Sequence, residues 1–367
     1  MSNELLINLS VLIPEPTGIS VYANNILPQL QQLNPTLLVA NNIPNFNCHL
    51  ISNNMTPAHG TQGHLRRLFW TQFKLSNIYK KLQANLLFSP LPEAPLFSQC
   101  RYIVMAHDLI PLRFPKPGSR LTAYFKYYIP QVLSQAEHII CNSQATAKDI
   151  TDFFQIPPQK ITPIPLGYDS QRFQFLDLPM KNYFLYLGRH DHYKNLHRLI
   201  EAFANLPNFS EYELWLAGPT DNIYTPILKT QIKELGLINL VKFLDYVPGA
   251  ELPKIINQAI ALVFPSLWEG FGFPVLEAMG CGTPVITSNI SSLSEVAGDA
   301  AILVNPKNVG EITDAMNIIT NDRVERSRLK TLSLARAREF SWSKTGLFTR
   351  EVIQNYQKIP RGVTNYL

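Results

Sequence analysis

The sequence contains little charge, few cysteines and no long apolar run. Charged residues are 16% of the 367-residue chain, against about 25% in a typical globular protein. The net charge of +5 is too small to indicate a nucleic-acid-binding protein. None of the four cysteines forms a C-x-x-C pair, so no disulfide framework is indicated. No uninterrupted apolar stretch reaches about 18 residues, which excludes a membrane-spanning helix.

Several motifs of nucleotide-binding and hydrolytic enzymes are also missing. The glycine pairs in GFGFPV and GCGTPV lack the third glycine of the dinucleotide fingerprint, and there is no G-K-[ST] phosphate loop and no G-x-S-x-G elbow. No D-x-D pair, a common clamp for a metal-bound diphosphate, occurs either. A diphosphate ligand would therefore have to be held by protein cations and helix dipoles, and we expect no metal ion.

What is present is the composition of a globular protein. Hydrophobic residues make up 46% of the chain, and its length allows two or three domains. The 28 prolines indicate many short connections between buried elements. The first residues, MSNELLINLSVLIPEP, have no basic segment ahead of their apolar run, so we expect no signal peptide and a cytoplasmic protein.

Short apolar runs alternate with amphipathic stretches, which predicts α/β structure with parallel sheets. A proline-rich stretch separates two expected domains, residues 1–172 and 178–349. Strands are expected at 5–13, 35–40, 85–88, 101–106 and 138–141, and then at 183–187, 213–217, 241–243, 261–264 and 284–287. Helices are expected at 19–33, 65–82, 121–133, 145–154, 196–205 and 342–356. Ligands of such sheets bind beyond the carboxyl ends of the strands, so we expect a cleft shared by the two domains and lined by residues that follow strands.

The most informative stretch is 266–284, SLWEGFGFPVLEAMGCGTP, which predicts a loop followed by a helix between two strands. Pro274 suits the first position of that helix, because the N–H that proline lacks would have no partner there. The amides of Phe271, Gly272 and Phe273 then lie at the helix entry, where free N–H groups and the helix dipole attract an anion or sugar oxygens.

Two carboxylates bracket this helix entry. Glu269 lies just before it and Glu277 lies about one turn inside the helix. A carboxylate can accept hydrogen bonds from two vicinal hydroxyls, so the combination suits a nucleotide sugar. The alternative is that acidic residues near the helix start only stabilise the helix.

Two cations, Arg189 and Lys194, follow the strand at 183–187 and precede another helix. Together they could neutralise a diphosphate, and the alternative is a solvated loop with ordinary surface cations. The H-x-H spacing of His190 and His192 between them could recruit a transition metal. Because no cysteine joins this pair, we favour a loop that faces the cleft.

The first half of the chain offers two weaker candidates. Gly18 begins a helix after a strand and could present its amide to a phosphate. His107 follows the strand at 101–106 and could donate a hydrogen bond to a sugar hydroxyl or to charge that develops on a substrate. A turn glycine and a structural histidine are the respective alternatives.

These segments resemble the group 1 (family 4) retaining glycosyltransferases, which have the GT-B fold of two facing Rossmann-like domains. EGFGFPVLE matches their E-x7-E signature, LGRHDHYKN their G-[RT]-x4-K-N segment, TGISVYANNIL their amino-terminal phosphate loop, and SSLSEVAGDAAILVNP and FSWSKTG their closing region. HDLIPLRFP is similar to a segment of the mannosyltransferase-like branch. NSQATAKDI departs from the family pattern, with Gln144 and Ala147 in place of a glutamate and an arginine.

The resemblance implies roles for the candidate residues. Arg189 and Lys194 would hold the diphosphate and Glu277 the ribose, while Glu269 and the amides of residues 271–273 would bind the sugar. Gly18 and His107 would face them from the first domain, which a last helix at about 350–367 would rejoin. The expected catalytic residues are His107, Glu269, Arg189 and Lys194.

The resemblance further implies a hexosyltransferase that uses a nucleoside-diphosphate sugar, for example GDP-mannose, with no cofactor and with retention of anomeric configuration. The acceptor would be a glycan or lipid-linked saccharide in cell-surface polysaccharide synthesis. Two alternatives stay open: a catalytically silent sugar-nucleotide-binding scaffold, and an epimerase or phosphorylase on the same fold.

The expected helix at 65–82 combines an apolar stripe with Phe69, Trp70 and five cations, Arg66, Arg67, Lys74, Lys80 and Lys81. Such a helix could lie on an anionic membrane as a peripheral contact. The alternative is an ordinary half-buried domain helix.

Overall fold

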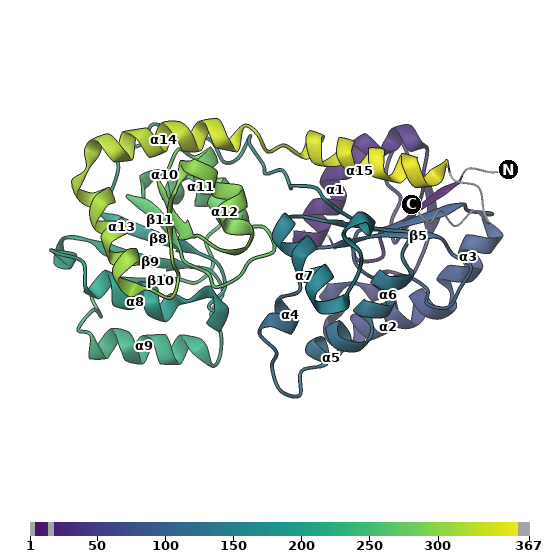
Figure 1. Ribbon diagram of the computed structural model, residues 1–367, viewed down its shortest axis with the longest axis horizontal. Coiled ribbons are helices and arrows are strands. Elements are labelled where there is room, and N and C mark those ends of the chain that lie inside the picture. Colours follow the sequence, from purple (N-terminus) through teal and green to yellow (C-terminus); the bar gives the residue numbers. More distant parts are fainter. Residues whose placement is uncertain (1–3, 14–17, 359–367) are drawn as a thin grey trace. The chain divides into compact units, whose positions relative to one another are not determined.

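The computed structural model describes residues 4–13 and 18–358 (Figure 1). The chain divides into two compact units. The first comprises residues 1–167 and 342–367, and the second comprises residues 168–341. Both are α/β units with wholly parallel sheets, which confirms the expected fold class. Within the described residues, no helix has the length and apolarity needed to cross a bilayer.

The first unit is built on a seven-stranded parallel sheet with the order β3-β2-β1-β4-β5-β6-β7. Its central strands are buried on both faces and read as continuous apolar runs, as parallel strands covered by helices do. The strands are β1 (Leu5–Asn8), β2 (Thr36–Val39), β3 (Asn47–Leu50), β4 (Leu86–Ser89), β5 (Tyr102–Ala106), β6 (His138–Cys141) and β7 (Ile161–Pro163).

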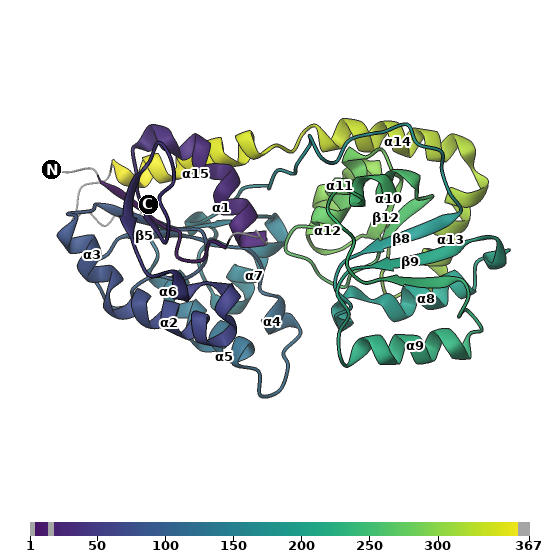
Figure 2. The ribbon, with the colours of Figure 1, turned by 180° about the vertical axis from the view of Figure 1, so that it is seen from behind.

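Helices cover both faces of this sheet. Figures 1 and 2 show α1 and α15 on one face and α2, α3 and α6 on the other. The helices of the unit are α1 (Gly18–Leu30), α2 (Gly60–Phe73), α3 (Leu75–Lys81), α4 (Ile110–Arg113), α5 (Arg120–Tyr127), α6 (Ile129–Gln135), α7 (Gln144–Phe154) and α15 (Trp342–Gln357).

The second unit has a six-stranded parallel sheet with the order β10-β9-β8-β11-β12-β13. Its strands are β8 (Tyr183–Leu187), β9 (Glu213–Ala217), β10 (Val241–Leu244), β11 (Ala261–Phe264), β12 (Val285–Ser288) and β13 (Ile302–Val304). Its helices are α8 (Leu196–Ala204), α9 (Tyr224–Glu234), α10 (Leu252–Gln258), α11 (Phe273–Gly280), α12 (Ser291–Ala297), α13 (Val309–Asn321) and α14 (Arg323–Ala337). Helices α8 and α9 lie on one face, and α10, α11 and α12 lie on the other (Figure 1).

The last helix differs from the expectation. Helix α15 belongs entirely to the first unit, so residues 342–349, expected in the second domain, lie with the first. Thr345 donates to the carbonyl of Pro165 over 2.8 Å. Gly346 lies so close to α1 that a Cβ there would be 2.7 Å from Cγ of Gln29. The chain therefore rejoins the first unit at Trp342, as soon as this helix begins to pack on α1.

Two expected helices are interrupted, and three strands were not expected. The stretch 65–82 forms α2 and α3, which meet at Lys74, and 121–133 forms α5 and α6, where Pro130 follows a break at Tyr128. The unexpected strands are β3, β7 and β13. Two of them have three residues and β3 is largely polar, so none gives an apolar run long enough to indicate a strand.

Each sheet has one point where the strand order reverses. In the second unit this point lies between β8 and β11, and in the first it lies between β1 and β4. Loops that leave neighbouring strands in opposite directions open a crevice there, where open α/β sheets bind ligands. The loop after β8 carries Arg189 and Lys194, and the loop after β11 carries Glu269. The sequence candidates of the second unit therefore gather at its switch point.

Candidate active site

The two loops at the switch point of the second unit are bonded to each other. The amide of Leu267 donates to the carbonyl of Tyr193 over 2.7 Å. Buried Asn195, whose φ of 64° is tolerated by asparagine, donates from Nδ2 to the carbonyls of Pro265 and Pro306 over 2.9 and 2.6 Å. Asn195, the residue before the helix expected at 196–205, thus fixes the loop of Lys194 against the loop of Glu269.

These bonds bring together a buried ion pair that sequence spacing could not reveal. Nζ of Lys194 lies 2.6 Å from Oε1 of Glu269, and the two side chains are 12% and 10% exposed. The ammonium also lies 5.4 Å from the ring centre of Phe264 and 5.1 Å from that of Tyr193. Among the described residues the ammonium has no second hydrogen-bond acceptor, so two of its three N–H groups can bind a ligand.

Helix α12 holds the Glu269 loop from behind. The hydroxyl of Ser292 donates to the carbonyls of Glu269 and Phe271, and the amide of Glu269 donates to the hydroxyl of Ser291. Gly272 has a φ of 108°, and a Cβ there would lie 2.7 Å from Cδ2 of Leu293. The backbone conformation and the contact with α12 therefore require glycine here.

The expected helix entry is present. Helix α11 begins at Phe273 with Pro274 in its first turn and Gly272 as its N-cap residue. No described residue accepts a hydrogen bond from the amides of Phe271 or Gly272. These N–H groups can bind an anion or sugar oxygens at a helix start, as the sequence predicts.

Glu277 lies inside α11, where burial raises the pKa of its carboxyl to about 8. The nearby Arg172 opposes this shift, and the charge of Asp169 adds to it. The segment with these two residues packs tightly on the helix, since a Cβ on Gly280 would lie 2.5 Å from the ring of Tyr168. No described residue makes a hydrogen bond or ion pair with the Glu277 side chain, so both of its oxygens can meet a ligand.

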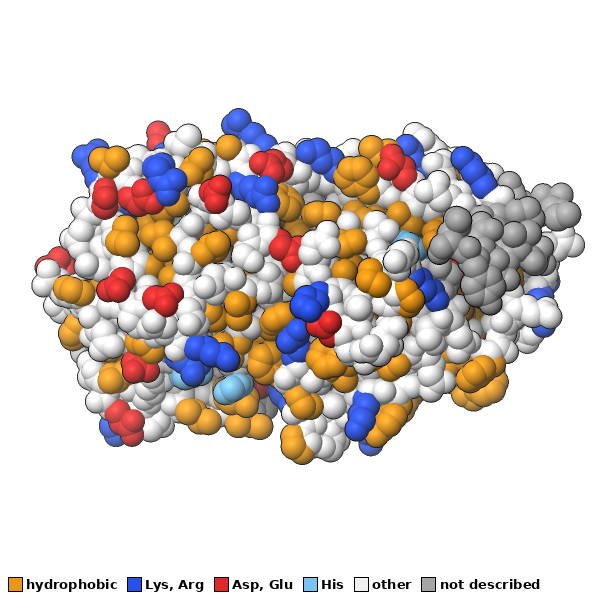
Figure 3. All heavy atoms as spheres, in the orientation of Figure 1, with side chains coloured by type: hydrophobic (Ala, Val, Ile, Leu, Met, Phe, Trp, Pro, Cys, Tyr) orange, Lys and Arg blue, Asp and Glu red, His pale blue; other side chains and the backbone are white. Residues whose placement is uncertain are grey.

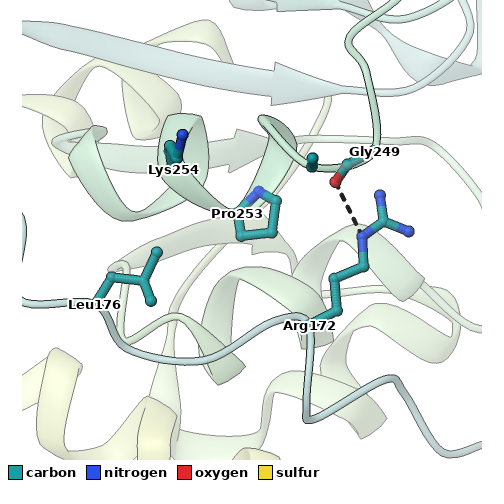
Figure 4. A pocket seen from close by; sticks show the side chains of 6 residues that line it. Arg172, Leu176, Gly249, Pro253 and Lys254 are labelled. Carbon is teal, nitrogen blue, oxygen red and sulfur yellow. Dashed lines mark hydrogen bonds between the residues drawn. The ribbon is translucent and has the colours of Figure 1, made fainter.

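A cavity of about 510 Å³ adjoins this segment (Figure 4). Arg172 lines it and donates from Nε to the carbonyl of Gly249 over 3.1 Å. Leu176 and Pro253 give the cavity apolar walls, and Lys254 adds a second cation. Arg172 both lines the cavity and lowers the pKa of Glu277, so the cavity lies close to the Glu277 carboxyl.

Arg189 differs from Lys194. Its side chain is 68% exposed, and its Nε lies 3.2 Å from Oδ2 of Asp191. The hydroxyl of buried Tyr186 donates to the backbone carbonyl of Arg189 over 2.9 Å and orders the loop here. Arg189 is thus on the same loop as Lys194, but it forms a separate ion pair in which the arginine is exposed and Asp191 is buried.

The histidines of this loop contact nearby residues of the same unit. Buried His190 bonds through Nδ1 to the hydroxyl of Thr225 at 3.0 Å, and His192 stacks on His197 with ring centres 5.8 Å apart. Burial lowers the pKa of His190. Among the described residues, no group of three or more His, Cys, Asp or Glu side chains is placed to hold a metal ion.

In the first unit, His107 follows β5 as expected, but its hydrogen bonding differs from the expectation. Nε2 lies 2.9 Å from the carbonyl oxygen of Pro90, so the ring donates its N–H there. Burial lowers the pKa of the imidazole to about 4, which keeps it neutral near pH 7. Nδ1 is then an acceptor. The expectation that His107 donates to a substrate is wrong, because its N–H already bonds to the backbone.

Gly18 is the first residue of α1 and is exposed, and a Cβ at this position would meet no atom within 4 Å. Steric room therefore does not require glycine here. Its expected contact with a phosphate stays a prediction, and residues 14–17, which complete the expected phosphate loop, lie outside the described residues.

Both units match models of known families. Residues 168–333 match the model described as glycosyl transferases group 1, and residues 16–172 match that of glycosyltransferase family 4. Sucrose-phosphate synthase from Thermosynechococcus elongatus aligns with a TM-score of 0.74 over 96% of this chain and 98% of its own, at 17% identity. HepE from Anabaena in complex with UDP and glucose aligns with a TM-score of 0.70 over 96% and 99%, also at 17% identity. The fold is that of a GT-B glycosyltransferase.

Curated relatives are closer in sequence. O-antigen chain mannosyltransferase B of Escherichia coli is 30% identical over 275 residues, 70% of each chain. O-antigen chain mannosyltransferase RfbU of Salmonella typhimurium is 32% identical over 232 residues, 59% of this chain and 63% of the relative. The MMP alpha-(1->4)-mannosyltransferase of Mycolicibacterium hassiacum is 31% identical over 61% of this chain and 55% of its own. This chain belongs to the group 1 (family 4) glycosyltransferases.

Proposed function

We propose that the protein transfers a hexose, mannose in the first instance, from a nucleoside-diphosphate sugar to a glycan or lipid-linked saccharide in polysaccharide synthesis. The transfer would need no metal and would retain the anomeric configuration. The buried pair of Lys194 and Glu269 at the switch point carries the proposal, because it offers an unsatisfied cation beside a sugar-binding carboxylate. The mannosyltransferase relatives support the choice of sugar.

The donor binds along the residues of the second unit in this proposal. Free N–H groups of Lys194, together with Arg189, take the diphosphate. The carboxylate of Glu269 and the amides of Phe271 and Gly272 take the sugar. Glu277 accepts hydrogen bonds from the ribose, and the neighbouring cavity at Arg172 has room for the base.

Electrostatic stabilisation supplies the catalysis. Negative charge grows on the diphosphate as its bond to the sugar breaks, and Lys194 lies in a mostly buried place where a fixed cation acts strongly. The acceptor hydroxyl forms the new bond to the anomeric carbon as the bond to the diphosphate breaks, and its proton passes to the leaving diphosphate oxygen. Neutral His107 can take part only as a hydrogen-bond acceptor, through Nδ1.

Calorimetric titration tests the donor assignment. GDP, UDP, ADP, GDP-mannose, UDP-glucose and UDP-N-acetylglucosamine are titrated into the protein with a chelator present. We expect selective binding of one nucleotide and its sugar, and GDP-mannose in the mannosyl case. Binding that appears only when a divalent metal is added would contradict metal independence. Binding of none would contradict the donor assignment.

Product analysis tests the reaction itself. With the donor so identified and a saccharide acceptor, NMR of the first product formed shows the configuration at the new linkage. Retention is expected, and an inverted product would refute the mechanistic assignment while leaving the donor assignment intact. Release of the free sugar or its epimer without any acceptor would favour the epimerase alternative.

A further inference from the structure

The loop that follows β5 is bonded at both ends to residues 142–149, which lie in the NSQATAKDI segment and begin α7. The loop runs from His107 to Arg113, the last residue of α4. At its start, Nδ2 of Asn142 donates to the backbone carbonyl of His107 over 2.7 Å. At its end, Nε of Arg113 donates to the two carboxylate oxygens of Asp149 over 3.1 and 2.9 Å. Figures 1 and 2 show α4 beside α7, so this helix determines where the loop lies.

A chain of buried hydroxyl groups fixes the orientation of the Asn142 side chain. Ser143, the N-cap residue of α7, donates from its hydroxyl to the hydroxyl of Thr146 over 3.0 Å. Thr146 donates in turn to Oδ1 of Asn142 over 3.0 Å. All three residues are at most 4% exposed. Because Oδ1 accepts from Thr146, the other end of the amide, Nδ2, is the end that faces the carbonyl of His107.

The contact of Arg113 with Asp149 holds the other end of the loop. Asp149 is fully buried, and the forked contact of a guanidinium with both carboxylate oxygens is a strong one. The guanidinium also lies 5.6 Å from the ring centre of Phe153 on the same helix. Lys148 and Asp152 of α7 face solvent instead, paired at 2.9 Å with side chains 72% and 49% exposed. Figure 3 shows basic and acidic side chains together where α7 and α4 lie in Figure 1. Helix α7 therefore has a solvated side and a side that holds the loop.

The ring of His107 is held as well as its backbone. Nε2 donates to the carbonyl of Pro90 over 2.9 Å, and the ring lies edge-on to Tyr22, with ring centres 5.3 Å apart and planes at 82°. Since Nε2 carries the proton, Nδ1 presents a lone pair, and no described residue makes a hydrogen bond with it. One acceptor atom of a fixed imidazole is therefore available to a ligand.

We propose that Asn142 is a positioning residue, which holds His107 where Nδ1 can accept a hydrogen bond from the bound substrate. This rests on the proposed function, in which neutral His107 takes part as an acceptor. Without the Asn142 amide, the carbonyl of His107 loses this partner, and the start of the loop can shift away from Pro90 while Arg113 still holds its end. Displacement of an aligned group by about 1 Å is enough to slow a reaction markedly.

Two measurements on the full chain test the proposal, and the first needs no substrate. Nitrogen NMR of the histidine rings, with His107→Ala to assign the signals, reports which nitrogen of His107 carries the proton. In the parent chain we expect only the form protonated on Nε2 near pH 7. In Asn142→Ala we expect a mixture of the two neutral forms, because the bond to Pro90 no longer selects one of them. An unchanged His107 spectrum in Asn142→Ala would overturn the proposal.

The second measurement is a double-mutant cycle on kcat. Asn142→Ala should lower kcat about ten-fold, while donor affinity measured by calorimetry changes little, because the donor-binding residues belong to the second unit. In a His107→Ala background the same change should have no further effect, since a positioning residue acts through the residue that it holds. Equal losses of kcat in both backgrounds would show a general structural role and also overturn the proposal. A parent chain that binds no sugar nucleotide would instead contradict the proposed function, and the NMR comparison would still decide whether Asn142 holds His107.

Variants of Thr146 test the bond that orients Asn142. Thr146→Val keeps the shape of the side chain but removes the hydroxyl, so it should lower kcat about three-fold and change the His107 spectrum in the same direction as Asn142→Ala. Thr146→Ser keeps the hydroxyl and should lose much less. Equal His107 spectra in these two variants would contradict the orienting role of the hydroxyl.

The matched control is Lys148→Gln on the same helix, because this side chain is exposed and should affect neither measurement. Thermal unfolding confirms that each variant is folded. If Asn142→Ala does not fold, the comparison of Thr146→Val with Thr146→Ser tests the same contact. Changes in the control as large as those in Asn142→Ala would assign the effects to α7 in general and overturn the proposal.

Discussion

Two ion pairs of the described residues, one in each unit, have both side chains no more than 12% exposed, and they are completed differently. In the first unit, Arg67 and Glu93 are 6% and 1% exposed and bond through two N–H groups, with Met55 and Tyr124 as further partners. In the second unit, Lys194 and Glu269 share a single bond of 2.6 Å. The first pair has its hydrogen-bonding capacity filled by protein, and the second does not.

The difference separates a structural pair from a ligand-binding one. Buried charges are tolerated when their remaining donors and acceptors are satisfied, as those of Arg67 are. Lys194 keeps two donors available at the switch point of a parallel sheet, where ligands bind. Burial and charge alone do not distinguish the two pairs. The number of bonds each partner makes, and its place relative to the strand order, do.

The largest effect is expected from breaking the structural pair. Glu93→Gln keeps the shape of the side chain but leaves the Arg67 guanidinium buried without its counter-charge, so the free energy of unfolding should fall by about 3–5 kcal/mol. Denaturant titration measures this. Glu137→Gln is the control, because it breaks the more exposed pair with Arg101 and should cost about 1 kcal/mol or less. Similar losses in both variants would contradict the structural role of Glu93.

For the Lys194–Glu269 pair we expect a large loss of activity and a smaller loss of stability. Lys194→Ala should lower kcat about 10²–10³-fold, because it removes a cation fixed beside the leaving diphosphate. Its unfolding free energy should fall by less than that of Glu93→Gln, because this pair makes one hydrogen bond instead of two and is more exposed. Steady-state kinetics and denaturant titration on the same preparations measure the two effects.

The control for Lys194 is Lys242→Ala, which removes a surface cation of the same unit paired with Glu213. It should change neither kcat nor stability by more than a small amount. A Lys194→Ala enzyme with unchanged kcat would refute the role of the pair in phosphate binding, whatever its stability.

The fold was largely predictable from the sequence, because parallel strands buried on both faces appear as continuous apolar runs. Strands β8, β9 and β11 have the expected bounds. Short or polar edge strands such as β3 carry no such pattern and were missed. The breaks at Lys74 and Tyr128 lie inside stretches whose helical periodicity continues across them, so periodicity predicted one helix where two exist.

The site was predictable as a set of segments but not as a geometry. The sequence pattern predicted that Arg189, Lys194 and Glu269 lie in loops that follow strands. These loops meet because β8 and β11 are neighbours in the sheet, which the sequence pattern does not indicate. The contact of Lys194 with Glu269 depends on Asn195 and on a backbone bond between the loops, and no spacing rule reports such long-range bonds. The hydrogen bond of His107 to Pro90 likewise depends on which strand neighbours β5.

A moderate effect of pH is expected on nucleotide binding, through Glu277 of the second unit. Glu277 has a pKa raised to about 8, so near pH 7 it is mostly protonated. If it binds the ribose as a carboxylate, nucleotide affinity should rise about ten-fold per pH unit toward pH 8 and then level off, with proton release on binding below that pH. Calorimetry in buffers of different ionisation enthalpy measures both. Glu277→Gln should remove the pH dependence, and its persistence in that variant would exclude Glu277 as the cause.

The pKa shifts of buried histidines in the first unit and of Glu277 in the second make stability depend on pH in opposite directions. In the first unit, burial lowers the pKa of His107 and of His138 to about 4, so the unfolded chain takes up protons that the native chain does not and stability falls as pH drops from about 6.5 to 4. For Glu277 the native state holds the proton, so its contribution to stability falls as pH rises from about 4.5 to 8.

The smallest effect is expected from Arg189, and salt should separate it from Lys194. Arg189→Ala removes a cation that is 68% exposed, so nucleoside-diphosphate affinity should fall only about three- to ten-fold, with no change in unfolding free energy. Because exposed charges are screened by salt and buried ones much less so, this loss should shrink at high ionic strength. The loss caused by Lys194→Ala should persist there. Titrations of both variants at low and high salt measure the contrast. Equal salt dependence would mean that the two cations meet the diphosphate in similar surroundings, contrary to the exposures of their side chains in the free protein.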